Sequence, residues 1–280
     1  MGRFKKLLGV FVIGLFLIPF NDVSGQDVLD GIYVPEHART RKVIAYTPLR
    51  EADVMWTKRV WRNIDLKEKI NHPLYYPLEE KSTYKSLFQV IQDGITEGTI
   101  TAYDVIDDEF KSPMTIDQVN AKLASTDTQY VENFETGELE QTVITNETKS
   151  VHMRQYRLKE DWFFDRQKSV QDTRIIGMMP IKAKEDESGN EVGLESLFWI
   201  YYPQARYVFA NQGVFNRQND AERRTYEDVF WKRMFNSYII KEANVYDRSF
   251  YDYTKGIAFQ FESERVKNEL FLQEHDLWSF

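Results

Sequence analysis

The sequence predicts an α+β protein in which a β-rich central region is flanked by N-terminal and C-terminal helices. Two observations lead to this class. Segments near both ends of the chain carry apolar side chains at helical spacing. The middle instead alternates apolar and polar residues in short runs that turn residues separate, as strands and hairpins do. Because the two kinds of segment are segregated along the chain, the class is α+β rather than α/β.

The first 25 residues are expected to be a secretory signal peptide. Arg3, Lys5 and Lys6 precede an apolar run from Leu7 to about Phe20. We expect no membrane span, since this run is too short to cross about 30 Å of hydrocarbon and no later run is longer. The chain has no cysteine, so it can carry neither a lipid on a cysteine nor a disulfide.

Residues 26–50 are expected to form an extended arm, and residues 51–280 a single α+β domain. The arm contains Pro35 and Pro48 and has no regular apolar period. The remaining length is ample for a large core. The full chain has 36 Lys and Arg against 44 Asp and Glu, a formal net charge of −8 at pH 7. This acidic balance excludes nucleic acid as an expected partner.

The first helix is predicted over residues 51–70. At 100° per residue, Trp56, Val60 and Ile64 share one face, and the proline after this segment would end a helix. Trp61 lies beyond that face, so the apolar arc is wider than a helix on one core requires. We therefore expect this helix to be covered from two directions.

The other helices are predicted from the same period and from capping residues. Thr115 is a typical N-cap, and Gln118 three residues later completes a capping box. Gly94 would end the helix before it. These helices are expected at residues 82–93, 115–125, 221–242 and 259–273.

Strands and hairpins are predicted in the central region. A hairpin is expected to turn at Thr136-Gly137. An acidic, glycine-containing loop over residues 185–191 is expected to join two later strands. The strand-forming segments are YVENFETGELEQTVIT, QYRLKEDWFFD, RIIGMMPIKAK and SLFWIYYPQARYVFA.

Aromatic residues supply the candidates for contact with a partner protein. The chain has 19 Phe, 16 Tyr and 6 Trp, and such side chains dominate both core and interface energetics. Two segments that combine aromatic and charged side chains, residues 53–77 and 226–250, are expected to help build such a contact. The alternative is that these aromatic side chains lie in the core of one domain. The candidate interface residues are Trp56, Trp61, Tyr75, Tyr76, Trp231, Phe235 and Tyr238.

No motif specific to an enzyme, a metal site or a cofactor site is present. The four histidines lack metal-ligand spacing, and no phosphate-binding or nucleophile motif occurs. The best enzymatic candidate is EDWFFD, in which Glu160 and Asp165 accompany aromatic residues as in a glycosidase. An exported carbohydrate-active hydrolase is therefore one alternative function. A monomeric periplasmic module that binds a small ligand is another.

Several segments resemble the GldN family, also called PorN, of gliding-motility proteins from Bacteroidetes. They are DVMWTKRVWRNIDLKEKINHPLYYP, EDWFFD with RIIGMMP, FWIYYPQAR, KRMFNSYIIKEANVYDRSF and EHDLW, spanning about Ala52 to Trp278. The resemblance implies a non-enzymatic subunit of the type IX secretion and gliding machinery. Neighbouring copies would form a periplasmic ring with an outer-membrane lipoprotein of the GldK or PorK kind.

The resemblance also sets expectations for the motor and for chemistry. A motor protein of the GldM or PorM kind would be a further partner, through its periplasmic domain. The chain would be associated with the outer membrane only peripherally, through the lipidated partner. No catalytic residue, metal or cofactor follows from the resemblance.

Overall fold

The computed structural model describes residues 41–79, 84–132, 139–185, 191–216, 219 and 221–277. Contacts divide the chain into two units, residues 1–35 and 36–280, and every described residue belongs to the second unit. The predicted signal peptide, residues 26–40 of the predicted arm and the Thr136-Gly137 turn lie outside the described residues. So does most of the predicted loop at residues 185–191.

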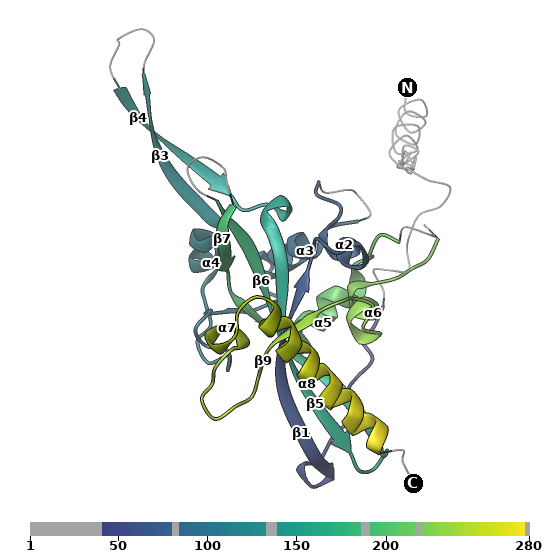
Figure 1. Cartoon of the computed structure of the whole chain (residues 1–280). Helices are drawn as coiled ribbons and strands as arrows, with labels where there is room; N and C mark the ends of the chain where they lie inside the picture. Colours follow the sequence, from purple (N-terminus) through teal and green to yellow (C-terminus); the bar gives the residue numbers. More distant parts are fainter. Residues whose placement is uncertain are drawn as a thin grey trace, which may run out of the picture. The chain divides into compact units, whose positions relative to one another are not determined.

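An antiparallel sheet organises the described residues and confirms the α+β class (Figure 1). Its strands run in the order β2-β8-β6-β5-β1-β9, and β7 pairs with β6 beside this path. Strands β3 (Ala124–Glu132) and β4 (Leu139–Glu147) form a separate hairpin that extends away from the sheet. The sheet strands are β1 (Val54–Asp65), β2 (Ala102–Tyr103), β5 (Met153–Asp165), β6 (Val170–Glu185), β7 (Glu191–Ser196), β8 (Trp199–Tyr201) and β9 (Tyr238–Glu242).

Helices flank this sheet, and three of them confirm the sequence predictions. Helix α3 begins after Ser86 and α4 after Thr115, each with the two reciprocal hydrogen bonds of a capping box. The long C-terminal helix α8 was predicted over residues 259–273. The α-helices are α2 (His72–Tyr75), α3 (Leu87–Thr96), α4 (Ile116–Leu123), α5 (Tyr202–Asn211), α6 (Tyr226–Trp231), α7 (Phe250–Tyr253) and α8 (Ile257–Asp276), with 3₁₀ turns at Glu51–Asp53, Lys69–Asn71 and Ser150–His152.

The predicted helix over residues 51–70 is wrong, because most of it is strand β1. Along a strand, successive side chains point to opposite faces. Val60 accordingly packs with side chains of α8, while Trp61 packs on the other face with Met179 and Trp199. The wide apolar arc therefore reflects a strand that is covered on both faces.

Two further predictions are corrected. The predicted helix over residues 221–242 ends at Trp231, where Arg233 adopts φ 51°, and the chain then enters β9. The predicted strand in SLFWIYYPQARYVFA is limited to β8 and continues as helix α5. Pro203 lies in the first turn of that helix, where proline is well accommodated.

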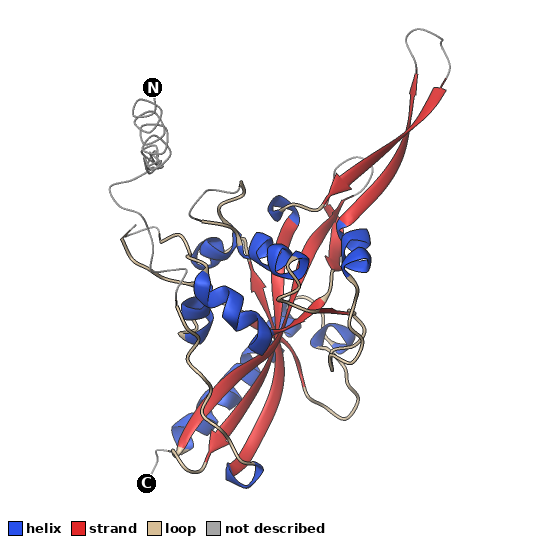
Figure 2. Cartoon of the chain, turned by 180° about the vertical axis from the view of Figure 1, so that it is seen from behind, coloured by secondary structure: helices blue, strands red, loops and turns tan. Residues whose placement is uncertain are grey.

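Buried apolar side chains form three clusters in the described part of the chain. The largest lies where α3, α5 and α6 pack against β5, β6 and β8. A second lies between α8 and the strands β1 and β9, and a third surrounds Trp61. Seen from behind, the long strands run past the upper helices to a lower end where α8 lies behind them (Figure 2). The sheet thus connects two separate helical layers.

A loop at residues 104–112 closes the third cluster through Phe110. The Phe110 ring packs edge-on against Tyr103 and Tyr201, at centroid distances of 5.4 and 5.5 Å. It also covers Gly177 of β6, where an added Cβ would lie 2.5 Å from Phe110 Cζ and 3.3 Å from Trp199 Cε3. Glycine at this position therefore allows the ring to reach the sheet.

We expect Gly177→Ala to lower the free energy of unfolding by about 1–3 kcal/mol, the usual cost of overpacking a filled core. The ring cannot simply turn away, because aromatic neighbours hold it. Urea unfolding measures the change. Gly193→Ala on β7 is the matched control, since an added Cβ there meets nothing within 4 Å. Equal stability of the two variants would contradict this account of Phe110.

Candidate functional site

The predicted interface residues separate into core and surface positions. Trp61 is only 7% exposed and belongs to the third cluster, so its side chain is not available to a partner. Phe235 and Tyr238 are partly buried against the core. Tyr76 and Trp231 are 44% and 46% exposed. The remaining two, Trp56 and Tyr75, are partly buried at the edge of clusters.

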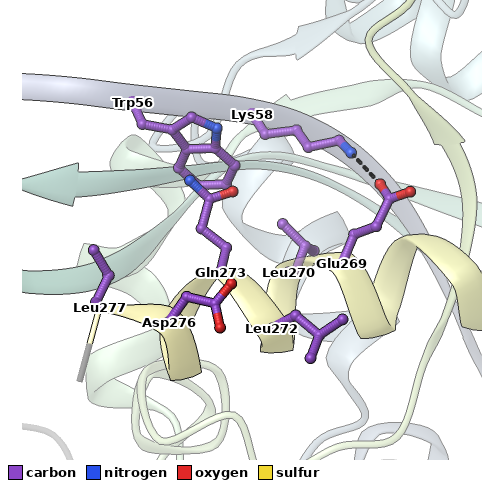
Figure 3. A pocket seen from close by; sticks show the side chains of 8 residues that line it. All are labelled: Trp56, Lys58, Glu269, Leu270, Leu272, Gln273, Asp276 and Leu277. Carbon is purple, nitrogen blue, oxygen red and sulfur yellow. Dashed lines mark hydrogen bonds and ion pairs between the residues drawn. The ribbon is translucent and has the colours of Figure 1, made fainter. Parts of the chain in front are cut away.

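Trp56 lines a groove of about 570 Å³ between β1 and α8 (Figure 3). The groove exists because α8 packs against the sheet along a stripe containing Ser263, Val266 and Leu270, which are buried. Beyond this stripe, the C-terminal end of α8 stands over the first residues of β1. The lining residues are Trp56, Lys58, Glu269, Leu270, Leu272, Gln273, Asp276 and Leu277.

Ion pairs hold the charged side of this groove in place. Lys58 Nζ lies 2.7 Å from a carboxylate oxygen of Glu242 and 3.1 Å from one of Glu269. Arg265 adds ion pairs to both of these carboxylates. Partial burial favours a higher pKa for Glu269, but Lys58 and Arg265 outweigh it and lower that pKa. The groove thus combines an apolar wall with a fixed charged rim, as protein interfaces do.

A second apolar hollow, of about 220 Å³, lies between α2 and α6. Tyr76, next to α2, packs edge-on against Tyr75 at a centroid distance of 4.9 Å. Both predicted tyrosines therefore belong to one exposed aromatic corner near this hollow. The hollow is lined by Ile70, Pro73, Leu74, Arg224, Val229 and Met234.

The third surface is occupied by the chain itself. Residues 41–47, which we call the strap, lie in extended form beside α6, along the purple trace in Figure 1. The Tyr46 ring stacks on Trp231, with centroids 5.6 Å apart and planes inclined by 25°. The guanidinium groups of Arg206 and Arg174 lie 3.9 and 4.9 Å from the centroid of Tyr46. One tyrosine side chain is therefore enclosed by one indole and two cations.

Polar contacts fix the backbone of the strap. Arg206 Nη2 donates to the carbonyl oxygen of Ile44 at 2.7 Å, and Arg174 Nη2 donates to that of Thr47 at 2.6 Å. Lys168 Nζ donates to Thr47 Oγ1 at 2.8 Å. Arg41 pairs with Asp228 of α6. We call the surface that holds the strap the seat; it comprises Lys168, Arg174, Arg206, Asp228 and Trp231.

The central arginine of the seat, Arg206, is held in position by residues on the side away from the strap. Arg206 is buried in α5, and its Nε donates to Glu227 Oε1 at 2.7 Å. The Tyr202 hydroxyl donates to the other Glu227 oxygen at 3.0 Å. Burial, reinforced by Glu227, raises the pKa of Tyr202 well above its ordinary value and keeps it a donor. Sequence reasoning identified only Trp231 of the seat, because the seat residues come from separate segments of the chain and carry no motif.

The two carboxylates of the hydrolase alternative do not form a site. Glu160 is 0% exposed, with Arg62 Nε 3.1 Å and Arg233 Nη2 3.0 Å from its oxygens. Trp162 Nε1 also donates to it at 3.2 Å. Asp165 instead accepts from the backbone N–H groups of the turn that follows β5. Five residues of strand place the two Cα atoms about 16 Å apart and the two side chains on opposite faces, whereas the carboxylates of glycosidases are roughly 5–9.5 Å apart.

Within the described residues, no group of three or more histidine, aspartate or glutamate side chains is placed to hold a metal ion. None of the described helices is both long and apolar enough to span a bilayer. Residues 49–279 match the model of a protein family described as gliding motility associated protein GldN. A comparison with curated proteins finds no match.

Proposed function

Because the chain belongs to the GldN family of gliding-motility components, we propose that it is a non-enzymatic structural subunit of the type IX secretion machinery. In this proposal, an N-terminal leader exports the chain to the periplasm. Copies assemble there into a ring with a lipoprotein of the GldK or PorK kind. The lipoprotein provides attachment to the outer membrane, since this chain has no cysteine that could carry a lipid.

The family match carries this proposal, and the groove between β1 and α8 is the surface that we assign to the contact with the lipoprotein. Its wall exposes Leu272 and Leu277, and Trp56 is only partly covered there. A large aromatic or aliphatic side chain that leaves water contributes roughly 25 cal/mol per Å². Association costs about 4–15 kcal/mol, so a stable complex needs several such contacts. Three exposed features together provide such contacts: the groove, the aromatic corner at Tyr76, and the side chain of Trp231.

The role of the motor partner follows from the same assembly. A periplasmic domain of the GldM or PorM kind would contact the ring rather than an isolated copy. Its binding should therefore depend on assembly with the lipoprotein. We assign no residue of this chain to that contact.

We expect Leu272→Asp to weaken co-assembly with the lipoprotein by at least about tenfold, because a charge would replace an apolar contact. Leu272 is 54% exposed, so the isolated chain should fold normally. Co-expression followed by measurement of the mass of the complex gives the result. Asn268→Asp is the matched control, since it adds the same charge at another exposed position of α8.

Two outcomes would count against the proposal in different ways. If Leu272→Asp and Asn268→Asp assemble equally well, the groove is not the contact with the lipoprotein. If the unchanged chain remains a monomer in the presence of the lipoprotein, the proposed function itself fails. A normal unfolding curve for Leu272→Asp is required before reduced assembly is attributed to the groove.

A further inference from the structure

We propose that the strap exchanges between copies, so that residues 41–47 of each subunit occupy the seat of its neighbour in the assembled ring. This inference rests on the proposed function and names the link between copies. A second copy of this chain is the partner that we propose, because each chain carries both a strap and a seat.

The strap is held as a peptide ligand is held. Residues 41–50 belong to no helix or strand, so no ladder of the sheet includes them. Side chains of the seat instead bind two backbone carbonyl groups and one hydroxyl of the strap. Burial raises the pKa of Tyr46, against the effect of Arg206, so the enclosed ring stays neutral. None of these contacts requires the strap and the seat to belong to the same chain.

The seat does not depend on the strap for its shape. Arg206 keeps its ion pair to Glu227, at 2.6 Å, whichever chain supplies the strap. Arg174 lies over the ring of Phe163, at 5.2 Å from its centroid, as well as over Tyr46. Trp231 belongs to α6, whose N-terminus has its own capping box at Thr225. A seat that is already built can accept a strap from another copy without refolding.

The connection between the strap and the sheet is suited to exchange. Pro48 and residues 50–52 are exposed, and Arg50 pairs with Asp53 only three residues further along. Residues Glu51–Asp53 form a 3₁₀ turn, and if that turn opened, the five residues 48–52 would span up to about 17 Å. The connection can therefore direct the strap away from its own seat, since no strand pairing has to break. Exchange of a terminal segment is a low-cost route to association for this reason.

A ring requires the two different, complementary patches that the strap and the seat provide. Head-to-tail contacts that close on rotation use one patch on each side of the subunit. An exchanged strap repeats each contact that it makes within one chain, so the link needs no new complementarity. Within an assembled ring, neighbouring seats are also at high effective concentration, so exchange can compete with the internal contact.

The absence of cysteine makes the proposal directly testable by cross-linking. Thr47 Oγ1 and Lys168 Nζ are 2.8 Å apart, so cysteines at these positions would be within reach of a short bis-maleimide. Chains carrying only Thr47→Cys are mixed with chains carrying only Lys168→Cys and assembled with the lipoprotein. We expect a covalent dimer. The double variant should give a ladder of covalent multimers from the ring.

Controls separate exchange from chance collision and from failure of assembly. Thr47→Cys mixed with Lys267→Cys, on the exposed side of α8, measures collision within the ring. If rings of normal mass form but the double variant cross-links only within single chains, the exchange is overturned and the proposed function stands. If no ring forms, both fail. Covalent dimers at the collision rate alone would also overturn the exchange.

Discussion

Glu160→Gln is expected to lower the free energy of unfolding by about 3–5 kcal/mol, the usual result of removing one partner from a buried ion pair. Glu160 lies between the guanidinium groups of Arg62 and Arg233, both stacked at 5.4 Å from the ring of Trp162. Burial lowers the pKa of Arg62, and the charge of Glu160 opposes that shift. Without the carboxylate, Arg62 remains a buried cation with no counter-ion.

Urea unfolding of Glu160→Gln beside Asp161→Asn tests this expectation. Asp161 is the next residue of β5 and pairs with Arg59, with its side chain 25% exposed. An exposed pair contributes about 0–1 kcal/mol, so the control should change little. Similar losses in both variants would contradict a structural role for the buried charge. Release of reducing sugar by the unchanged chain, abolished in Glu160→Gln, would instead support the hydrolase alternative.

Trp61→Ala is expected to destabilise the chain by about 3–5 kcal/mol, as large-to-small substitutions of buried tryptophan do. The ring is packed between strands and has two ammonium groups near it, Lys159 at 5.8 Å and Lys241 at 4.4 Å from its centroid. The Lys159 side chain is only 3% exposed, and this burial lowers its pKa. The substitution therefore removes both apolar packing and favourable cation–π contacts.

Thermal or urea unfolding measures this loss, and Met55→Ala is the control on the same strand. Met55 is exposed, so its truncation should change stability by no more than about 0.5 kcal/mol. Trp61→Ala protein that remains folded should still co-assemble with the lipoprotein. Normal stability combined with lost assembly would place Trp61 at an interface and contradict its position in the core.

The elements predicted correctly are those with a local signal. Thr115 with Gln118 defines the start of α4 by direct hydrogen bonds between neighbours. Helix α8 buries Ser263, Val266 and Leu270 at helical spacing, although its exposed side also carries Phe261 and Phe271. Such signals do not depend on distant parts of the chain.

The wrong predictions concern segments whose conformation depends on packing against residues that are distant in the sequence. In β1 both faces are covered, so the alternation of apolar and polar residues is lost from Val60 to Ile64. A helical period then fits as well as a strand. The break after α6 occurs at Arg233, which adopts a positive φ without a glycine to mark it. Tertiary packing overrides local preference in both places.

The same distinction between local signals and distant contacts applies to the candidate site. Composition identified aromatic residues as candidates, and Tyr76 and Trp231 do lie on the surface. It could not separate them from Trp61, because core and interface use the same side chains. The strap lies within the extended arm predicted for residues 26–50, but its contacts with the seat were not predicted, for a different reason. Its main contacts join Ile44 and Thr47 to arginines on α5 and β6, more than a hundred residues away.

The pairing of β1 with β5 has a mechanical consequence. The two strands stay in one register from Trp56↔Phe164 to Asp65↔Gln155, after a bulge that follows Val54, with α8 at one end and the upper helices at the other. A pull directed along the strands loads all rungs of this ladder in shear at the same moment. A pull across them would peel the rungs apart one by one. If force acts on a subunit of a motile apparatus along the direction of β1 and β5, this strand pair would therefore transmit the tension with little extension.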